Sequence, residues 1–392
     1  MPDFTALAEN SEHADIRNAI RAICDQFDDA WWRERDRTAT FPHEFRKAIA
    51  DGGWLGIAMP EEYGGGGLGI TAAAIMMQTV AGSAGTFAAC SSIHMNIFGP
   101  HSIVVHGTPE QKARMLPPLI RGENIACFAI TEPDAGLDTT KLKTRAVRQG
   151  DKYVVKGQKV WTSTALEADR VVLLVRTTPV EECKRATDGL TLFYTPLDRR
   201  YVEIREIHKM GRAAVDSNDL FIDGLPVPVE DRIGEEGRGL HYAFDSLNPE
   251  RILVAAEAIG IGRRALGKAT RYANERVVFG RPIGKNQAVQ HPLAESWAEL
   301  YAAELMALRA AALYDAGKAC GAEANAAKYL AADAAFNACD RAVRVHGGMG
   351  YACEYDVERY FRESVATRLV PVSRELILCY LAERVLGLPK SY

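Results

Sequence analysis

Hydrophobic residues divide the 392-residue chain into three consecutive blocks with different periods. In the first block, which runs to about residue 125, Ile16, Ile20, Ile23 and Phe27 recur at steps of three and four. This spacing places apolar side chains on one face of a helix and predicts amphipathic helices. Further helices are predicted over residues 71–80, over residues 92–106, and from Pro109, because proline favours the first helical position.

A glycine-rich stretch, Gly52 to Ile70, interrupts these helices and predicts a loop. Two interpretations stay open at this point: a tight connection packed over the core, or a cradle for a phosphate group. No GxGxxG follows a strand here and no GKS or GKT ends the stretch. Rossmann-type and P-loop nucleotide sites are therefore excluded.

The second block is rich in short β-forming runs, over residues 151–163, 170–175 and 190–194, with glycine, aspartate and proline between them. The third block, from residue 239 to about 388, returns to long helices, predicted over about 239–279, 287–317 and 319–346 and followed by two shorter ones. The stretch 293–317 is rich in alanine. Helix, sheet and helix in that order predict an α+β fold rather than a doubly wound parallel sheet. The expected domains are N-terminal helices (1–125), a middle antiparallel β domain (126–236) and a C-terminal helical bundle (237–392).

Composition narrows the class of protein without naming it. Hydrophobic residues make up 47% and charged residues 25%, and the net charge is −4, which argues against a nucleic-acid binder. The N-terminus has no apolar signal segment, and no window reaches the ~18 apolar residues of a membrane helix, so we expect a cytoplasmic protein with no membrane insertion. Eight dispersed cysteines without a CxxC pair and nine histidines without HExxH predict no metal site.

Two segments of the middle block carry candidate chemistry. The first is AITEPDAGLD, Ala129 to Asp138, a compact turn after the first expected strand. The second is KVWTS, Lys159 to Ser163, where a tryptophan followed by hydroxyl residues fits an aromatic cofactor. Taken singly, each segment has a second interpretation. The first segment is equally typical of an ordinary turn, and Trp161 is equally typical of a core position.

Two segments of the third block are suited to a phosphate-bearing ligand. Residues 274–290 (NERVVFGRPIGKNQAVQ) and 344–363 (RVHGGMGYACEYDVERYFRE) contain arginine, glutamine and closely spaced glycines. Glycines let a backbone approach a ligand closely, and arginine pairs with a pyrophosphate.

Together, these four segments resemble the acyl-CoA dehydrogenase family, in the family's order and over essentially the whole chain. The resemblance implies an oxidoreductase of fatty acid or lipid metabolism, with FAD bound in an extended pose. It implies a homotetramer built as a dimer of dimers, an acyl thioester substrate on CoA or on an acyl carrier protein, and an electron-transfer flavoprotein as acceptor.

The resemblance also assigns residues to the cofactor. The isoalloxazine ring would be lined from one chain by Phe128, Ile130, Thr131, Gly136, Leu137, Trp161 and Ser163. The adenosine and pyrophosphate would be met from a neighbouring subunit by Arg276, Phe279, Gln287, Arg344, Gly347 and Gly348, and the C-terminal cofactor positions are Ser373 and Glu375.

The catalytic base is where this sequence departs from most of the family. A base takes the α-proton of the thioester while a β-hydride leaves to the flavin, giving a trans-2-enoyl product. The usual position of that base is Pro371, which has neither a carboxylate nor a backbone N–H. The segment LNPER, residues 247–251, resembles the isovaleryl-CoA and long-chain acyl-CoA dehydrogenases, so Glu250 is the candidate base. We expect Pro249 to kink its helix; the alternatives are an exposed or salt-bridged Glu250, with Glu375 as base.

The substrate side departs from the family at two further positions, and a milder change lies at the pyrophosphate. Leu137 stands where relatives have a hydroxyl residue, and Asn248 where an aspartate often meets the pantetheine, although Arg251 is kept. Arg344 replaces a usual glutamine and still suits a pyrophosphate. The expected substrate contacts are Leu137, Asn248 and Arg251.

These departures leave three hypotheses. The first is acyl-CoA dehydrogenation with Glu250 as base. The second is a flavoenzyme that acts on a carrier-protein-bound acyl group or works as an oxidase, for which Arg205, Lys209 and Arg212 are a possible basic patch or simply solvated surface. The third is a flavin-binding scaffold without dehydrogenation activity.

Overall fold

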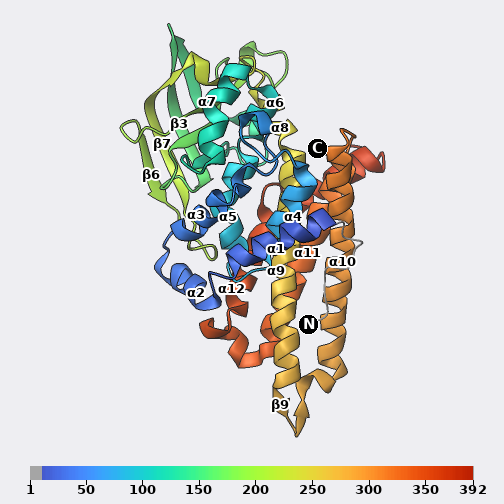
Figure 1. Ribbon diagram of the computed structural model, residues 1–392. Coiled ribbons are helices and arrows are strands. Elements are labelled where there is room, and N and C mark those ends of the chain that lie inside the picture. Colours follow the sequence, from blue (N-terminus) through green and yellow to red (C-terminus); the bar gives the residue numbers. More distant parts are fainter. Residues whose placement is uncertain (1–10, 392) are drawn as a thin grey trace.

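The computed structural model describes residues 11–391, which form a helical block, a sheet and a second helical block (Figure 1). The first ten residues, on which part of the expected cytoplasmic location depends, lie outside this range. The N-terminal helices are α1 (Ser11–Cys24), α2 (Asp29–Thr38), α3 (His43–Asp51), α4 (Gly69–Ala81), α5 (Thr86–Phe98), α6 (His101–His106) and α7 (Pro109–Ile120).

One predicted N-terminal helix is broken in two. The expected helix over residues 92–106 is the end of α5 followed by α6, with Gly99 and Pro100 between them. Proline has no backbone N–H to donate within a helix, which explains the break. The start of α7 is as predicted: Thr108 caps it, and its hydroxyl accepts from the backbone of Gln111.

The glycine-rich stretch is a tight connection. It contains two short 3-10 turns, Trp54–Gly56 and Glu61–Tyr63. A Cβ on Gly65 would lie 2.2 Å from the carbonyl oxygen of Met59, so only glycine fits at this close approach.

The middle block is an eight-stranded sheet in which β6, β7, β3, β2, β4, β5 and β8 follow one another and β1 also pairs with β4. The strands are β1 (Ala126–Ala129), β2 (Arg145–Gln149), β3 (Lys152–Ser163), β4 (Arg170–Arg176), β5 (Leu190–Pro196), β6 (Val202–Glu206), β7 (Ser217–Pro228) and β8 (Arg232–Ile233). Most pairs are antiparallel, as predicted, but β1 is parallel to β4 and places Phe128 opposite Val172. No hairpin joins these two strands, so the antiparallel arrangement is not imposed on them.

The third block consists of long helices and a small hairpin. Its elements are α8 (Gly239–Asp245), α9 (Leu247–Glu275), β9 (Val277–Val278), β10 (Arg281–Pro282), α10 (Gln287–Asp315), α11 (Gly321–His346), α12 (Val357–Leu369) and α13 (Arg374–Tyr380). None of the helices within residues 11–391 is long and apolar enough to cross a membrane.

A helix break lies just before Pro249, where the sequence predicts a kink, because proline cannot donate to the carbonyl oxygen four residues earlier. The helix predicted from residue 239 to 279 is two helices, α8 and α9, that meet at Ser246. Pro249 is the third residue of α9, where backbone N–H groups have no partner within the helix, so proline is tolerated there. Glu250 is consequently in the first turn of α9.

Helix α9 is the centre of the helical core. It lies beside α4 (Figure 1), and a Cβ on Gly260 would come 2.4 Å from the carbonyl oxygen of Gln78. The two backbones therefore touch, and this contact fixes the face that α9 turns toward the N-terminal helices.

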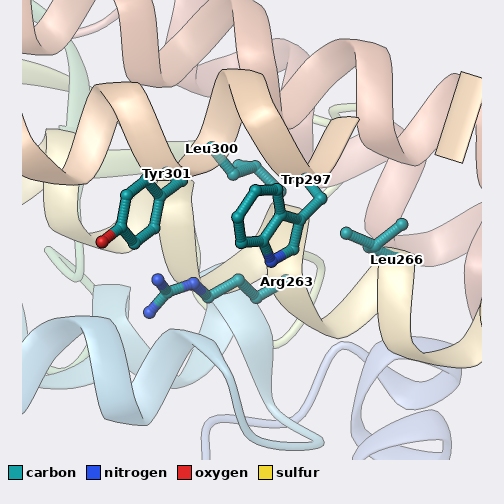
Figure 2. A pocket seen from close by; sticks show the side chains of 5 residues that line it. All are labelled: Arg263, Leu266, Trp297, Leu300 and Tyr301. Carbon is teal, nitrogen blue, oxygen red and sulfur yellow. The ribbon is translucent and has the colours of Figure 1, made fainter. Parts of the chain in front are cut away.

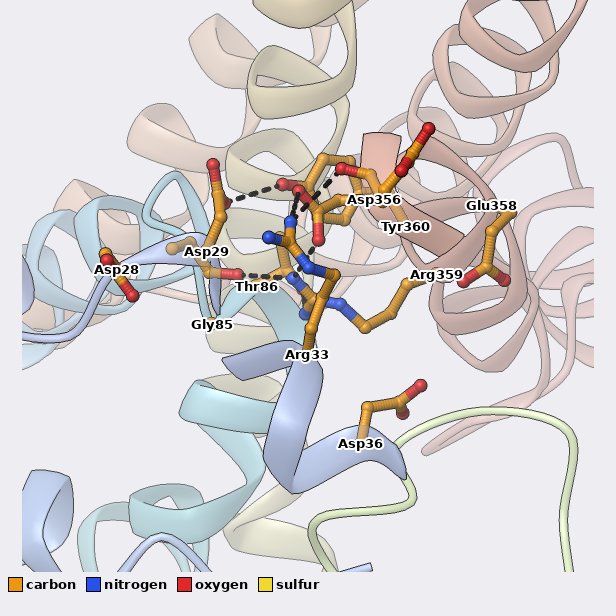
Figure 3. A network of polar contacts seen from close by, with 12 residues as sticks. Asp28, Asp29, Arg33, Asp36, Gly85, Thr86, Asp356, Glu358, Arg359 and Tyr360 are labelled. Carbon is orange, nitrogen blue, oxygen red and sulfur yellow. Dashed lines mark hydrogen bonds and ion pairs between the residues drawn. The ribbon is translucent and has the colours of Figure 1, made fainter. Parts of the chain in front are cut away.

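An ion network ties three helices together at the other side of the core (Figure 3). Asp29 of α2 accepts from Arg264 of α9 at 2.8 Å and from the Tyr360 hydroxyl at 3.3 Å. Asp356, which precedes α12, accepts from Arg33 at 2.9 Å. The network joins segments more than 300 residues apart in the sequence.

Candidate active site

The two candidate segments of the middle block come together at the edge of the sheet. The backbone N–H of Val160, on β3, donates to the carbonyl oxygen of Thr131 at 2.9 Å. Ile130 and Thr131, which follow β1, therefore lie directly beside Trp161 and Ser163. The structure thus brings the expected isoalloxazine contacts of both segments to one place.

A buried ion pair that the motif analysis missed holds this arrangement. The Lys159 ammonium donates to the Glu132 carboxylate and to the carbonyl oxygen of Ile130, each at 2.9 Å. The other contacts of Glu132 are the backbone N–H groups of Lys143 and Thr144. Burial lowers the pKa of Lys159 to about 8, against the attraction of Glu132. Removal of either charge would leave the other buried without a partner, which is strongly destabilising.

The surface above this pair is built for a flat apolar ligand. Trp161 is 57% exposed and Leu137 is 62% exposed, although both are large and apolar. The backbone of Trp161 has a left-handed φ of 60°, which is strained for a bulky residue and typical of functional sites. Nothing lies within 4 Å of a Cβ placed on Gly136, so the space beside this turn is open. These residues fit an isoalloxazine ring.

Glu250, the candidate base, lies in the first turn of α9, near His94 of α5. Its side chain is half-buried, and loss of hydration raises its pKa to about 7 even though the nearby cations His94, Arg251 and Lys328 oppose that shift. A carboxylate with a pKa near neutral is a stronger base than an ordinary glutamate and is still substantially ionised at pH 7.

Two buried polar atoms beside Glu250 have no partner among residues 11–391. They are Oγ of Ser246 and Nε of Arg251. A second guanidinium nitrogen of Arg251 donates to Asn248 at 3.1 Å. Buried polar atoms without partners are rare in folded proteins, so this corner of the site is suited to a polar ligand.

Helix α5 packs beside β1, the strand that carries Phe128. Ser91, His94 and Phe98 are three and four residues apart and so share one helix face. The ring of Phe98 lies 5.5 Å from that of Phe128, an expected flavin contact. At the other end of this face, Ser91 accepts from Arg212 at 3.0 Å.

His94, in the middle of that face, is paired with a second carboxylate of α9. Its Nδ1 lies 2.6 Å from Oε1 of Glu257, and both residues are buried. Burial alone would lower the pKa of His94, but the attraction of Glu257 and Glu250 leaves it raised. The imidazolium form is therefore favoured.

Arg212 faces the site and not the solvent, so it is not part of a basic surface patch. Its guanidinium donates to the hydroxyl groups of Ser91, Ser163 and Ser217 at 3.0–3.4 Å. Arg205 is paired with Glu203 on the surface at 2.7 Å. Arg205 and Arg212 therefore add little free charge to the possible basic patch for a carrier protein.

The segment that replaces the usual base is tied to α11. Lys328 donates to the carbonyl oxygen of Val372 at 2.7 Å, next to Pro371. Ser373 then caps α13 by accepting from the Leu376 N–H, and Glu375 is exposed in the first turn of that helix.

The remaining expected cofactor contacts lie elsewhere on the chain. Arg276 and Phe279 belong to the hairpin that connects α9 and α10, and Figure 1 shows this hairpin at the end of α9 far from the sheet. Phe279 is 99% exposed. Gln287 begins α10, whereas Arg344, Gly347 and Gly348 are at the C-terminal end of α11. The structure does not bring this group to the isoalloxazine residues of the same chain.

Sequence reasoning missed His94, Glu257 and Lys328, and it expected Arg212 on the surface. Each belongs to a helix or loop whose local pattern is unremarkable, and their partners are distant: His94 and Glu257 are 163 positions apart. The sequence could have indicated His94 and Glu257 only as polar residues at otherwise apolar positions of α5 and α9.

Comparison with known proteins follows the same three blocks. Residues 10–123, 127–225 and 237–386 match the N-terminal, middle and C-terminal domains of acyl-CoA dehydrogenases. The acyl-CoA dehydrogenase FadE12 of Mycobacterium tuberculosis is 36% identical over 394 residues, which cover 99% of each chain.

Two solved structures superpose closely. One is a glutaryl-coenzyme A dehydrogenase in complex with glutaryl-CoA, with a TM-score of 0.92, 30% identity and coverage of 99% of this chain and 98% of that one. The other is the prolyl acyl carrier protein oxidase AnaB, with a TM-score of 0.91, 29% identity and coverage of 97% and 100%.

Proposed function

The chain belongs to the acyl-CoA dehydrogenase family, and we propose that it removes hydrogen from Cα and Cβ of an acyl thioester with Glu250 as the base. The observation that carries this proposal is the position of Glu250: it is half-buried in the first turn of α9, with a pKa raised to about 7. It is also the only half-buried carboxylate among those we considered as base, because Glu375 is exposed and residue 371 is proline.

The side chains around Glu250 suit its proposed task. When bound, FAD supplies the hydride acceptor, and Phe128, Thr131, Trp161 and Ser163 would hold its ring. The Glu250 carboxylate takes the proton from Cα, and Arg251 and Ser246 have buried polar atoms free to orient the thioester. Exclusion of water by α5 and α9 strengthens each of these interactions.

A second copy of the chain would complete the cofactor site. Glu250 and Arg276 are 26 residues apart on or next to one helix, which corresponds to about 39 Å along its axis. The two groups of expected FAD contacts are therefore separated within one chain. Exposed aromatic residues on α10 also favour association: Trp297 is 45% exposed and stacks on Tyr301 above Arg263 (Figure 2). We propose a homotetramer on this basis.

The thioester carrier is proposed to be CoA, and the electron acceptor an electron-transfer flavoprotein. CoA is favoured over a carrier protein because Arg212 bonds inward and Arg205 is paired, so two of the three expected patch residues offer no free charge to an acidic carrier helix. A cytoplasmic location agrees with this chemistry and remains a prediction.

The direct test is anaerobic reduction of the bound flavin by acyl-CoAs. We expect bleaching of the flavin absorbance by at least one acyl-CoA, and a loss of about 10²–10⁴-fold in the rate for Glu250→Gln, the range for removal of a general base. Glu375→Gln is the matched control and should leave the rate within a few-fold. If Glu375→Gln abolishes reduction while Glu250→Gln does not, the assignment of the base is wrong.

A second candidate is an oxidase that acts on an acyl group held by a carrier protein. The similarity to the prolyl acyl carrier protein oxidase AnaB favours it. Stoichiometric hydrogen peroxide during aerobic turnover would identify the oxidase, whereas its absence together with reduction of an electron-transfer flavoprotein supports the dehydrogenase. A protein that binds flavin and is bleached by no thioester would instead be the scaffold.

A further inference from the structure

The His94–Glu257 pair does not take the proton in the proposed reaction, and His94 lies on the face of α5 that borders expected flavin neighbours. His94 is in the middle of the α5 face that runs from Ser91 to Phe98. Both ends of this face contact expected flavin neighbours, since Phe98 meets Phe128 and Ser91 is joined through Arg212 to Ser163. His94 therefore faces the space in front of the isoalloxazine residues, which a substrate must occupy for hydride transfer.

The spacing on α9 locates the pair relative to the base. Glu257 follows Glu250 by seven residues, which is about two turns of helix and about 10 Å along its axis. The two carboxylates thus share the face of α9 that is turned toward α5. An acyl chain whose Cα lies at Glu250 and whose tail runs along α9 passes His94, which is close enough to Glu250 for their charges to interact.

One nitrogen of His94 is open to a ligand. Nδ1 is bound to Glu257 at 2.6 Å, while Nε2 has no hydrogen-bond partner within the described part of the chain. The side chain keeps 10% of its surface exposed, against 2% for Glu257. With Nδ1 donating to a carboxylate, an imidazolium has a single remaining N–H, at Nε2, which can donate to an oxygen atom.

We infer that His94 and Glu257 form a subsite for a neutral oxygen, a hydroxyl or a carbonyl group, carried by the acyl chain a few carbons beyond Cα. The inference rests on the proposed function and specifies its substrate class. An unsubstituted alkyl chain against Nε2 would leave a buried N–H unpaired, which costs free energy. A carboxylate is less suitable than a neutral oxygen, because Glu257 already balances the imidazolium and Glu250 adds a further negative charge nearby.

The test compares acyl-CoAs of equal length in the holoenzyme. The series is hexanoyl-CoA, its 4-, 5- and 6-hydroxy derivatives, 5-oxohexanoyl-CoA and adipoyl-CoA, with kcat/KM from flavin reduction as readout. At least one hydroxy- or oxo-acyl-CoA should exceed hexanoyl-CoA by about tenfold, the effect of one buried hydrogen bond. Equal kcat/KM for all neutral substrates would overturn the inference. A clear preference for adipoyl-CoA would also overturn it and would indicate a subsite for a carboxylate.

Variants separate a substrate contact from a structural pair. His94→Phe should remove the preference, measured as the ratio of kcat/KM for the oxygenated substrate to that for hexanoyl-CoA at one pH. Loss of the His94 charge also changes the pKa of Glu250, but this acts on both substrates alike. Ser92→Ala is the control on the same helix, because the Ser92 hydroxyl bonds only the carbonyl oxygen of Ala89, at 2.7 Å, and it should keep the preference. If His94→Phe does not fold, the substrate series with the wild-type enzyme still tests whether an oxygenated acyl chain is preferred. A wild-type enzyme that no acyl-CoA of any kind reduces refutes the proposed function instead.

Discussion

The ammonium group of Lys328 donates a hydrogen bond to the carbonyl oxygen of Val372, and the two atoms lie 2.7 Å apart. This contact joins α11 to the segment that carries Pro371 in place of the usual base. Lys328 is buried, and burial lowers its pKa to about 8, so it carries its charge at neutral pH. Its charge also acts on Glu250, whose pKa it lowers.

Replacement of Lys328 should therefore change the pH dependence of the reaction. In Lys328→Met, Glu250 loses a nearby cation, and its pKa should rise by roughly half a unit or more. The midpoint of kcat/KM against pH, measured by flavin reduction, should move to higher pH by the same amount. Lys328→Arg keeps the charge and should keep the midpoint; an unchanged midpoint in Lys328→Met would show that the two groups are not coupled.

The wild-type enzyme should lose activity as the pH falls through about 7. Glu250 acts as a base only when ionised, and burial raises its pKa to about 7. We expect kcat/KM to increase with pH up to this value and then to level off. A profile that is flat from pH 5 to pH 8 would exclude Glu250 as the titrating base.

The same carboxyl group should make the wild type less stable than its inactive variant. The folded-state pKa is raised above the unfolded value, so Glu250 favours folding at low pH, and this contribution is lost as the pH rises through about 7. Glu250→Gln should consequently be more stable than wild type at pH 8, by up to about 3 kcal/mol. Urea unfolding at pH 8 and pH 5 checks this, and the difference should shrink at the lower pH.

The contribution of Asp29 to the free energy of unfolding should depend on pH in the opposite direction. Although burial opposes ionisation, Arg264 and Lys268 lower the pKa of Asp29 to about 2. The ionised form stabilises the fold above the unfolded pKa, and this stability is lost as the pH falls toward 2. Asp29→Asn should cost about 2 kcal/mol at pH 7, and the deficit in unfolding free energy should decrease below pH 4. The equivalent change at exposed Asp223, which pairs with Lys156, is the control and should cost little.

The sequence predicted most of the order of helical and β blocks but fewer of the residues in the candidate active site, and the difference has a physical reason. Hydrophobic periodicity is local, so it identified the helical and β blocks. It did not locate the helix breaks at Pro100 and Ser246, because the apolar pattern continues across both positions. Segments with distinctive residues, around Thr131 and Trp161, were identified because their residue types are unusual. His94 and Glu257 were not, because a pair 163 positions apart depends on how α5 packs on α9.

The last prediction concerns which chain completes the flavin site. Trp161 and Arg276 belong to the two separated groups of expected FAD contacts. Trp161→Gly keeps the backbone, because glycine accepts the left-handed φ of 60° without strain, and Arg276→Glu changes an exposed residue at the end of α9. Each variant alone should retain little flavin.

Co-expression of the two variants with different affinity tags distinguishes the possible arrangements. If each site takes Trp161 from one chain and Arg276 from another, a mixed pair contains one site with both native residues and one with neither. Doubly purified protein should then hold about half of the wild-type flavin per chain, measured by absorbance after removal of free cofactor. If one chain supplied both residues, every site in the mixed pair would be damaged and no flavin would be regained. Recovery in the mixed sample, with none when the same variant carries both tags, therefore requires a site shared between two copies.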